Sequence, residues 1–243
     1  MDDALWQMSA CELQRRYRDA SLTPLAVTRA VLARMDAVNP RLHAVVARRD
    51  EAVLAAAAAA TKRHAEGAPL SVLDGIPLTV KDSLFTADLP TTCGTAALRD
   101  HRPAHDELAA GRALAGGALM IGKTNVPEFA NDGYTANPLF GATGNPWNPA
   151  LTPGGSSGGA VAAVAAGIGP LAIAQDGGGS CRRSAGPADC RSGVRHRAVA
   201  AGRTAAAARR PRRRPSTTGR PPTARAVRRT AAARRPPCAP PGR

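Results

Sequence analysis

Residues 152–182, TPGGSSGGAVAAVAAGIGPLAIAQDGGGSCR, hold two serines in glycine-rich turns, Ser156 and Ser180. Between the turns lie a run of small residues typical of a helix and a short apolar run typical of a strand. Glycine frees the backbone for turns that a side chain would forbid and leaves main-chain N–H groups uncovered. Because Ser180 follows three glycines, its hydroxyl has the layout of a nucleophile beside an oxyanion hole.

The segments before this stretch predict α/β architecture. Ser9 and Glu12 form a capping-box pattern for a helix that runs to about Asp19. Thr23-Pro24 then begins a second helix, which Asn39-Pro40 ends, and a third helix is predicted over 50–66. Residues 1–66 therefore form a helical layer.

From Leu70 the pattern changes to short apolar runs punctuated by Gly and Pro. The run 76–80 predicts a strand that delivers Lys81 at its end. Further along, the sequence predicts a helix over 106–115, a buried strand over 118–121 and a long loop over 131–149. Helices that alternate with short apolar strands indicate an α/β layer fold.

The charge is concentrated at one end of the sequence. The net charge is +15, but residues 181–243 hold 18 Arg and one acid, Asp189, which gives +17 there and −2 over residues 1–180. The same segment has nine Pro, three Val and no Leu, Ile, Met, Phe, Tyr or Trp. Such a composition cannot bury enough apolar surface to offset chain entropy, so we expect a disordered basic tail over 184–243.

Cysteine usage and the N-terminus indicate the cytoplasm. The five Cys follow no metal or disulfide spacing, and the acidic start MDDALWQMSA lacks the apolar core of a signal peptide. No apolar run has the length of a membrane span. His101 and His105 are four residues apart, but Pro103 between them favours a loop over a helical metal pair.

Two formal motif matches are rejected on physical grounds. GALMIGKT at 117–124 fits the P-loop expression, but ALMI is strand-like where a phosphate cradle needs a loop. GGSSG at 154–158 fits the nucleophile elbow of α/β-hydrolases, but no strand precedes it and the one downstream histidine, His196, lies in the arginine-rich tail. Without imidazole, a lysine with a pKa lowered by burial could deprotonate a serine, and Lys81 at the end of an apolar strand is the candidate.

Five segments in order resemble the amidase signature family across residues 5–183. They are DGIPLTVKD at 74–82, GKTNVPEF at 122–129, FGATGNPW at 140–147, PGGSSGG at 153–159 and DGGGS at 176–180. The resemblance implies a mixed twisted sheet flanked by helices, with a partial catalytic core over 67–183.

The resemblance also implies the chemistry of the site. Ser180 would attack an amide carbonyl, and Ser156, in a cis-peptide turn in this family, would relay its proton to Lys81. The oxyanion hole would be formed by Gly177, Gly178 and Gly179, with supporting roles for Ser157, Asp176 and Arg182. An acyl-enzyme would be hydrolysed by water, without metal or cofactor.

The expected function is hydrolysis of a small-molecule carboxylic amide to acid and ammonia or amine. An alternative within the family is the glutamine-hydrolysing subunit of a tRNA-dependent amidotransferase. An alternative of another class is nonspecific nucleic-acid binding by the arginine runs, which lack the aromatic residues that stack on bases. A homodimer is left open, and no membrane partner is expected.

The sequence departs from the family pattern after Ser180. Cys181-Arg182-Arg183-Ser184-Ala185 keeps a trace of the family's continuation, which is then lost. An excess of Arg, Ala and Pro without Leu resembles GC-rich DNA translated out of frame. We hypothesise a frameshift that replaced the second half of the enzyme, and we expect poor folding and little activity from this chain. Translation of the other two frames of the coding DNA would test this.

Overall fold

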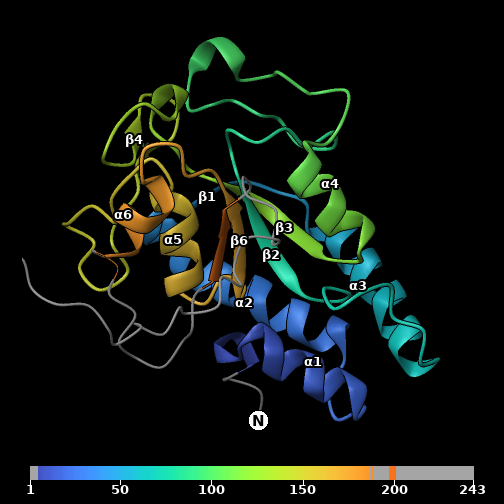
Figure 1. Ribbon diagram of the computed structural model, residues 1–243. Coiled ribbons are helices and arrows are strands. Elements are labelled where there is room, and N and C mark those ends of the chain that lie inside the picture. Colours follow the sequence, from blue (N-terminus) through green and yellow to red (C-terminus); the bar gives the residue numbers. More distant parts are fainter. Residues whose placement is uncertain (1–4, 187, 189–196, 201–243) are drawn as a thin grey trace, which may run out of the picture. The chain divides into compact units, whose positions relative to one another are not determined.

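The computed structural model describes residues 5–186, 188 and 197–200, with β2 (Pro77–Lys81) in the middle of a five-stranded sheet (Figure 1). The strand order is β1-β3-β2-β6-β7. All neighbouring pairs are parallel except β1 and β3, which are antiparallel. The other strands are β1 (Val45–Arg48), β3 (Leu119–Thr124), β6 (Leu171–Ala174) and β7 (Arg197–Ala200). The predicted α/β fold with a mixed sheet is confirmed.

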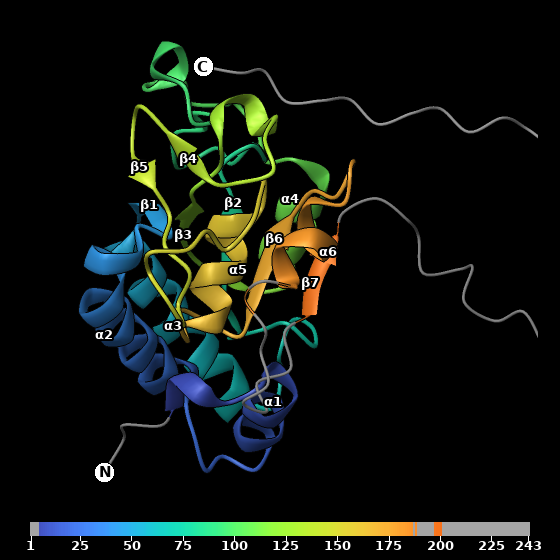
Figure 2. The same cartoon turned by 90° about the vertical axis from the view of Figure 1, so that its left-hand side faces the viewer.

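Helices cover both faces of the sheet, as the two views show (Figures 1 and 2). One face packs Leu119 and Ile121 against α2, α3 and α5, and the other packs Leu78, Val80 and Met120 against α4. The helices are α1 (Ala10–Arg18), α2 (Pro24–Leu42), α3 (Asp50–Ala65), α4 (Leu108–Ala115), α5 (Gly158–Ala165) and α6 (Ser180–Ala185). Short 3-10 turns lie at Leu5–Gln7, Ala96–Leu98 and Glu128–Ala130, and β4 (Ala136–Asn137) pairs with β5 (Gly141–Ala142) in a small antiparallel sheet.

The helix starts follow the caps predicted from the sequence. Ser9 Oγ accepts from Glu12 N at 3.2 Å, and Thr23 Oγ1 accepts from Ala26 N at 3.2 Å. The predicted end of the second helix at Asn39-Pro40 is wrong, because α2 continues to Leu42. A proline in the last turn removes one helical hydrogen bond but does not force the helix to end there. The helix ends instead at His43, which has a left-handed φ of 50°.

The helical layer predicted over residues 1–66 also contains a strand, since β1 lies within it. Asn39 explains the turn into this strand: its Oδ1 accepts from Ala44 N at 3.0 Å and Val45 N at 2.8 Å. Its Nδ2 donates to Val45 O at 2.9 Å. The strand then pairs with β3, which comes much later in the sequence, so local patterns do not reveal it.

A β-bulge in β3 decides which way its last residues point. Leu78 pairs with Met120 and Thr79 pairs with Gly122, so Ile121 is the extra residue. An extra residue reverses the alternation of side chains that follow it. Lys123 therefore pairs with Val80 and points to the face of α4, although simple alternation would have put it beside Ile121.

The last two residues of α6 and the whole of β7 lie inside the segment predicted to be a disordered tail. Helix α6 ends at Ala185, and β7 pairs in parallel with β6. Main-chain hydrogen bonds form this pairing, and they do not require large apolar side chains. Residues 187, 189–196 and 201–243, which include most of the predicted tail, lie outside the described residues. None of the described helices is both long and apolar enough to cross a membrane.

Candidate active site

Lys81, Ser156 and Ser180 meet at the carboxyl end of β2. Lys81 Nζ lies 2.8 Å from Ser156 Oγ, and Ser156 Oγ lies 2.7 Å from Ser180 Oγ. Ser156 N also donates to Ser180 Oγ at 3.3 Å. All three residues are buried, with exposed fractions of 1%, 2% and 8% in chain order. The arrangement is a continuous hydrogen-bonded path from an amine to the least buried hydroxyl.

The turn that carries Ser156 is built for close packing. The peptide bond between Gly155 and Ser156 is cis. A Cβ at Gly155 would lie 2.7 Å from the main-chain atoms of Tyr134, so only glycine fits. No strand precedes Ser156 among residues 151–155, which agrees with the rejection of the α/β-hydrolase elbow. Helix α5 begins directly after the turn, at Gly158.

Burial makes Lys81 a usable base. Desolvation lowers the pKa of its ammonium group from 10.5 to about 8, because a charged amine is disfavoured away from water. Cys181, Asp176 and Cys93 act in the opposite direction. A substantial neutral fraction is therefore present near pH 8, and neutral amine is the form that can accept a proton from a hydroxyl.

The glycine loop before Ser180 leaves open space beside it. Gly177 and Gly178 are exposed, and a Cβ on any of Gly177, Gly178 or Gly179 would meet nothing within 4 Å. Gly179 has φ 97°, which favours glycine, and Ser180 is the first residue of α6. Main-chain N–H groups and a hydroxyl therefore lie next to room for a ligand.

The Asp176–Arg182 pair closes this loop. Arg182 Nε and Nη2 donate to the two carboxylate oxygens of Asp176 at 2.9 and 3.0 Å, and Arg182 N donates to Oδ2 at 3.2 Å. These donors, together with Gly179 N, hold the pKa of Asp176 well below its usual value. Among the described residues, no hydrogen bond joins this carboxylate to the hydroxyl of Ser156 or Ser180, and its side-chain hydrogen bonds are to Arg182.

Ser157 lies beside the path and not within it. Its Oγ donates to Gln175 O at 3.1 Å and accepts from Cys181 Sγ at 3.6 Å. Gln175 Oε1 in turn accepts from Ser83 Oγ at 3.0 Å. These contacts tie the end of β6 to the loop after β2, so that the two strands that flank the site end together.

The asparagine-rich loop over 131–149 is fixed by side-chain amides. Asn137 Nδ2 donates to Asn125 Oδ1 and to Val126 O, both at 2.7 Å. Asn125 Nδ2 donates to Thr143 Oγ1 at 3.0 Å. The loop is thereby attached to the end of β3, close to the turn that carries Ser156.

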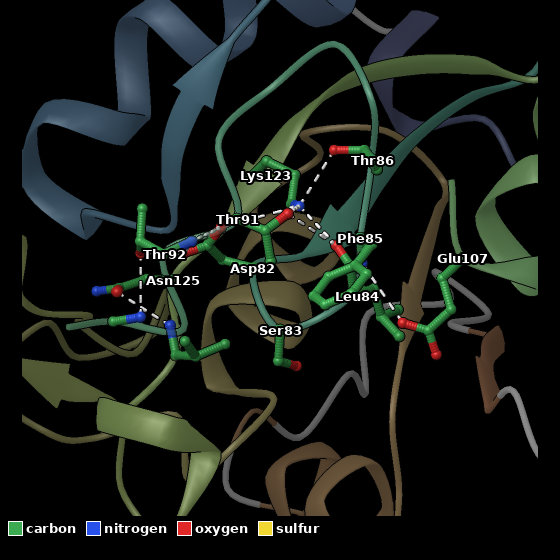
Figure 3. A network of polar contacts seen from close by, with 12 residues as sticks. Asp82, Ser83, Leu84, Phe85, Thr86, Thr91, Thr92, Glu107, Lys123 and Asn125 are labelled. Atoms are coloured by element: carbon green, nitrogen blue, oxygen red, sulfur yellow. Dashed lines mark hydrogen bonds and ion pairs between the residues drawn. The ribbon is translucent and has the colours of Figure 1, made fainter. Parts of the chain in front are cut away.

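A second polar cluster, which the sequence did not reveal, lies on the other side of β2 (Figure 3). Asp82 and Lys123 are both buried, and Lys123 Nζ lies 3.9 Å from Asp82 Oδ1. Both residues stand in the quoted family segments, next to Lys81 and within GKTN, which is the signal that could have drawn attention to them. Leu119–Thr124 is a strand, which agrees with the rejection of a phosphate loop.

The described residues contain no group of three or more His, Cys, Asp or Glu side chains placed to hold a metal ion. His101 and His105 lie in a non-helical segment, as predicted. Their rings lie edge-on to Phe85, with centroids 5.9 and 6.2 Å from its ring.

Comparison with known proteins agrees with this architecture. The family model described as Amidase matches residues 26–190. An indoleacetamide hydrolase of Bradyrhizobium diazoefficiens is 44% identical over 186 residues, which are 76% of this chain and 35% of that protein. The A-type subunit of the glutamyl-tRNA(Gln) amidotransferase of Chloroflexus aurantiacus is 40% identical over 181 residues, 74% of this chain and 37% of that protein.

A solved structure gives the same result. The crystal structure of a bacterial aryl acylamidase of the amidase signature enzymes family superposes with a TM-score of 0.70 at 35% identity, covering 73% of this chain and 37% of that one. The chain belongs to the amidase signature family of hydrolases. It spans little more than a third of the length of the curated relatives named here, 35% and 37%.

Proposed function

We propose that this chain carries the catalytic triad of an amidase, with Ser180 as nucleophile, Ser156 as proton relay and Lys81 as base. The observation that carries the proposal is the unbroken path from Lys81 Nζ to Ser180 Oγ, with steps of 2.8 and 2.7 Å. A hydroxyl can donate one hydrogen bond while it accepts another, which suits Ser156 to the middle position. The lowered pKa of Lys81 supports its role as base.

The reaction would proceed in two halves. Ser180 Oγ forms a bond to the amide carbonyl carbon, its proton moves to Ser156 Oγ, and the Ser156 proton moves to neutral Lys81 Nζ. Collapse of the tetrahedral intermediate breaks the C–N bond, and the leaving amine takes a proton back along the same path. Water then attacks the acyl-enzyme by the same proton route and releases the acid.

The loop before Ser180 would stabilise the negative charge on the oxygen. We assign this role to the main-chain N–H groups of Gly177, Gly178 and Gly179, together with that of Ser180. Asp176 and Arg182 would hold the loop in shape, and Ser157 would hold the end of β6. The open space beside the three glycines supports this assignment.

Covalent labelling tests the proposal without requiring turnover. The chain is incubated with a fluorophosphonate, which reacts with activated serines, and the intact mass and labelled peptide are followed over time. We expect a single adduct on Ser180, none in Ser180→Ala, and labelling at least about 100-fold slower in Lys81→Met. Ser21→Ala, at an exposed serine, is the control. An adduct on a different serine, or an unchanged rate in Lys81→Met, would refute the assignment.

The match to the amidotransferase subunit favours glutamine as a second candidate substrate. Because little activity is expected from this chain, ammonia release from L-glutamine is followed over long incubations beside release from indoleacetamide, and the comparison of the two separates the candidates. Release from glutamine alone would support the amidotransferase alternative. The cytoplasmic location and the homodimer stay predictions of the sequence.

A further inference from the structure

The second buried lysine, Lys123, has a complete set of acceptors. Its Nζ donates to Leu84 O at 2.6 Å, Thr91 Oγ1 at 2.8 Å and Thr86 Oγ1 at 3.2 Å. An ammonium group has three N–H donors, so these acceptors match the charged form. All three come from the segment directly after β2, as Figure 3 shows. Lys123, which lies in β3, therefore anchors the segment that follows Lys81.

Asp82 supplies the countercharge and is anchored itself. Its carboxylate accepts from Thr92 N at 3.2 Å and from Thr92 Oγ1, and lies 3.9 Å from Lys123 Nζ. Its main-chain N donates to Thr124 O at 3.0 Å, and its carbonyl accepts from Cys93 N at 3.1 Å. The residue that follows Lys81 is thus fixed through its side chain and both main-chain groups.

Asp82 and Lys123 lie on the opposite face of the sheet from Lys81, the proposed base. Consecutive residues of a strand point to opposite faces, so Lys81 faces Ser156 while Asp82 faces the α4 side. The bulge at Ile121 turns Lys123 to that same side. Asp82 and Lys123 are 1% and 0% exposed, so neither can touch a substrate.

We propose that Asp82 and Lys123 are positioning residues, which hold Lys81 Nζ against Ser156 by fixing the segment 82–92 to β3. The inference rests on the proposed function, because it concerns the placement of the base. Burial raises the pKa of Asp82 and lowers that of Lys123 to about 8, and the hydrogen bonds around both groups favour the ionised pair.

Direct electrostatics is the competing explanation, and it predicts a different pattern. The charges that act on Lys81 are those of Cys181, Asp176 and Cys93. If Lys123 and Asp82 also acted on Lys81 through charge, removal of the cation would raise the pKa of Lys81 and removal of the carboxylate would lower it. Loss of positioning instead lets water reach Lys81, which raises its pKa in both variants.

The chain offers a direct measurement, because Lys62, Lys81 and Lys123 are its three lysines. In protein labelled with 13C-lysine, the Cε shifts report three separate titrations, assigned by Lys→Met variants. Lys62, whose side chain is 78% exposed, is the internal reference. We expect the pKa of Lys81 to rise by about one unit or more in both Lys123→Met and Asp82→Ala. Shifts in opposite directions, or no shift in either folded variant, would overturn the proposal.

A variant that leaves every charge in place keeps the test decisive if Lys123→Met or Asp82→Ala does not fold. Thr91→Val removes one acceptor of Lys123 without changing any charge, so a raised Lys81 pKa there can come from position alone. Thr28→Val is the matched control, because Thr28 is a buried threonine of α2 whose Oγ1 donates to Pro24 O at 2.8 Å. An unchanged Lys81 titration in Thr91→Val would count against the proposal.

A negative result in the titration and a negative result in the labelling experiment have different consequences. If the fluorophosphonate does not label Ser180, the proposed function is lost, but the Lys81 titrations still show whether the pair positions that amine. If Ser180 is labelled and the pKa of Lys81 is unchanged in the variants, the triad is supported and the positioning role is refuted.

Discussion

At the scale of single residues, the proposed chemistry depends on an amine that folding has made less basic. Lys81 has a pKa of about 8 in place of 10.5 because it is buried, with 1% of its surface exposed. With that pKa, roughly a tenth of the amine is neutral at pH 7 and half at pH 8. Since the neutral form would accept the proton in the proposed mechanism, that mechanism ties the reactivity of Ser180 to this equilibrium.

The rate at which Ser180 is labelled should therefore depend on pH in a defined direction. We expect about a tenfold rise per pH unit below pH 8 and a plateau above it. The measurement is the rate constant of fluorophosphonate labelling between pH 6 and pH 9. Lys62→Met should give the same profile as the parent chain, because Lys62 is exposed and remote from Ser180 in the sequence. A flat profile would show that Lys81 is not the base.

The sequence predicted the meeting of Lys81, Ser156 and Ser180 because each stands in its own quoted segment. It did not predict that Lys123 would lie beside Asp82. Along an unbroken strand Lys123 would share a face with Ile121, and the bulge that reverses its direction depends on pairing with β2. Pairing between distant strands is not visible in the local pattern around 117–124.

At the scale of elements, α5 depends on a close approach to Asn125, the residue that follows β3. A Cβ on Gly159 would lie 2.4 Å from Asn125 O and 2.5 Å from Asn125 N. Helix propensity alone would make alanine better than glycine here by about 1 kcal/mol. The contact with main-chain atoms outweighs this preference, because the Asn125 backbone is itself held by a hydrogen bond from its N to Ala44 O at 2.9 Å.

Gly159→Ala should consequently destabilise the chain by about 1–3 kcal/mol, the usual cost of overpacking. It should also slow labelling of Ser180, because the turn with Ser156 leads directly into α5. Urea denaturation and labelling kinetics measure the two effects. Gly133→Ala is the control, since the nearest atom to its Cβ would be 3.8 Å away. Stabilisation by Gly159→Ala would show that α5 shifts freely.

Helix starts were predictable because caps act locally, within three residues of Ser9 and Thr23. Strand β1 was not, because it depends on the Asn39 side chain and on a partner strand near Gly122. The end of α2 was misplaced for a different reason. Pro40 is a common helix breaker, but in the last turn it removes only one helical hydrogen bond, and the helix continues to Leu42.

At the scale of the whole molecule, two buried lysines make stability depend on pH. Lys81 and Lys123 have folded pKa values of about 8, below the ordinary value of 10.5. Above pH 8 the unfolded chain therefore binds more protons than the folded one, and stability rises with pH. Above pH 9 the thiols of Cys93 and Cys181 oppose this rise, because burial raises their pKa values.

We expect the free energy of unfolding to increase by about 1 kcal/mol per buried lysine between pH 8 and pH 9. Urea denaturation at closely spaced pH values measures it. Lys123→Met should remove more than half of the increase, because it removes one buried lysine and also raises the pKa of Lys81, and Lys62→Met should leave the increase unchanged. A decrease over this interval in the parent chain would contradict burial of the two amines.

The position of β2 between β3 and β6 has a consequence for the nascent chain on the ribosome. Leu78 pairs with Met120 on one side and with Leu171 on the other. Until the later partner emerges, one edge of β2 is a bare template that another polypeptide could join. At a synthesis rate of about 5–20 residues per second, this interval lasts roughly 5 to 20 seconds. The strand order therefore predicts that the exposed edge of β2 needs shielding by a chaperone during translation.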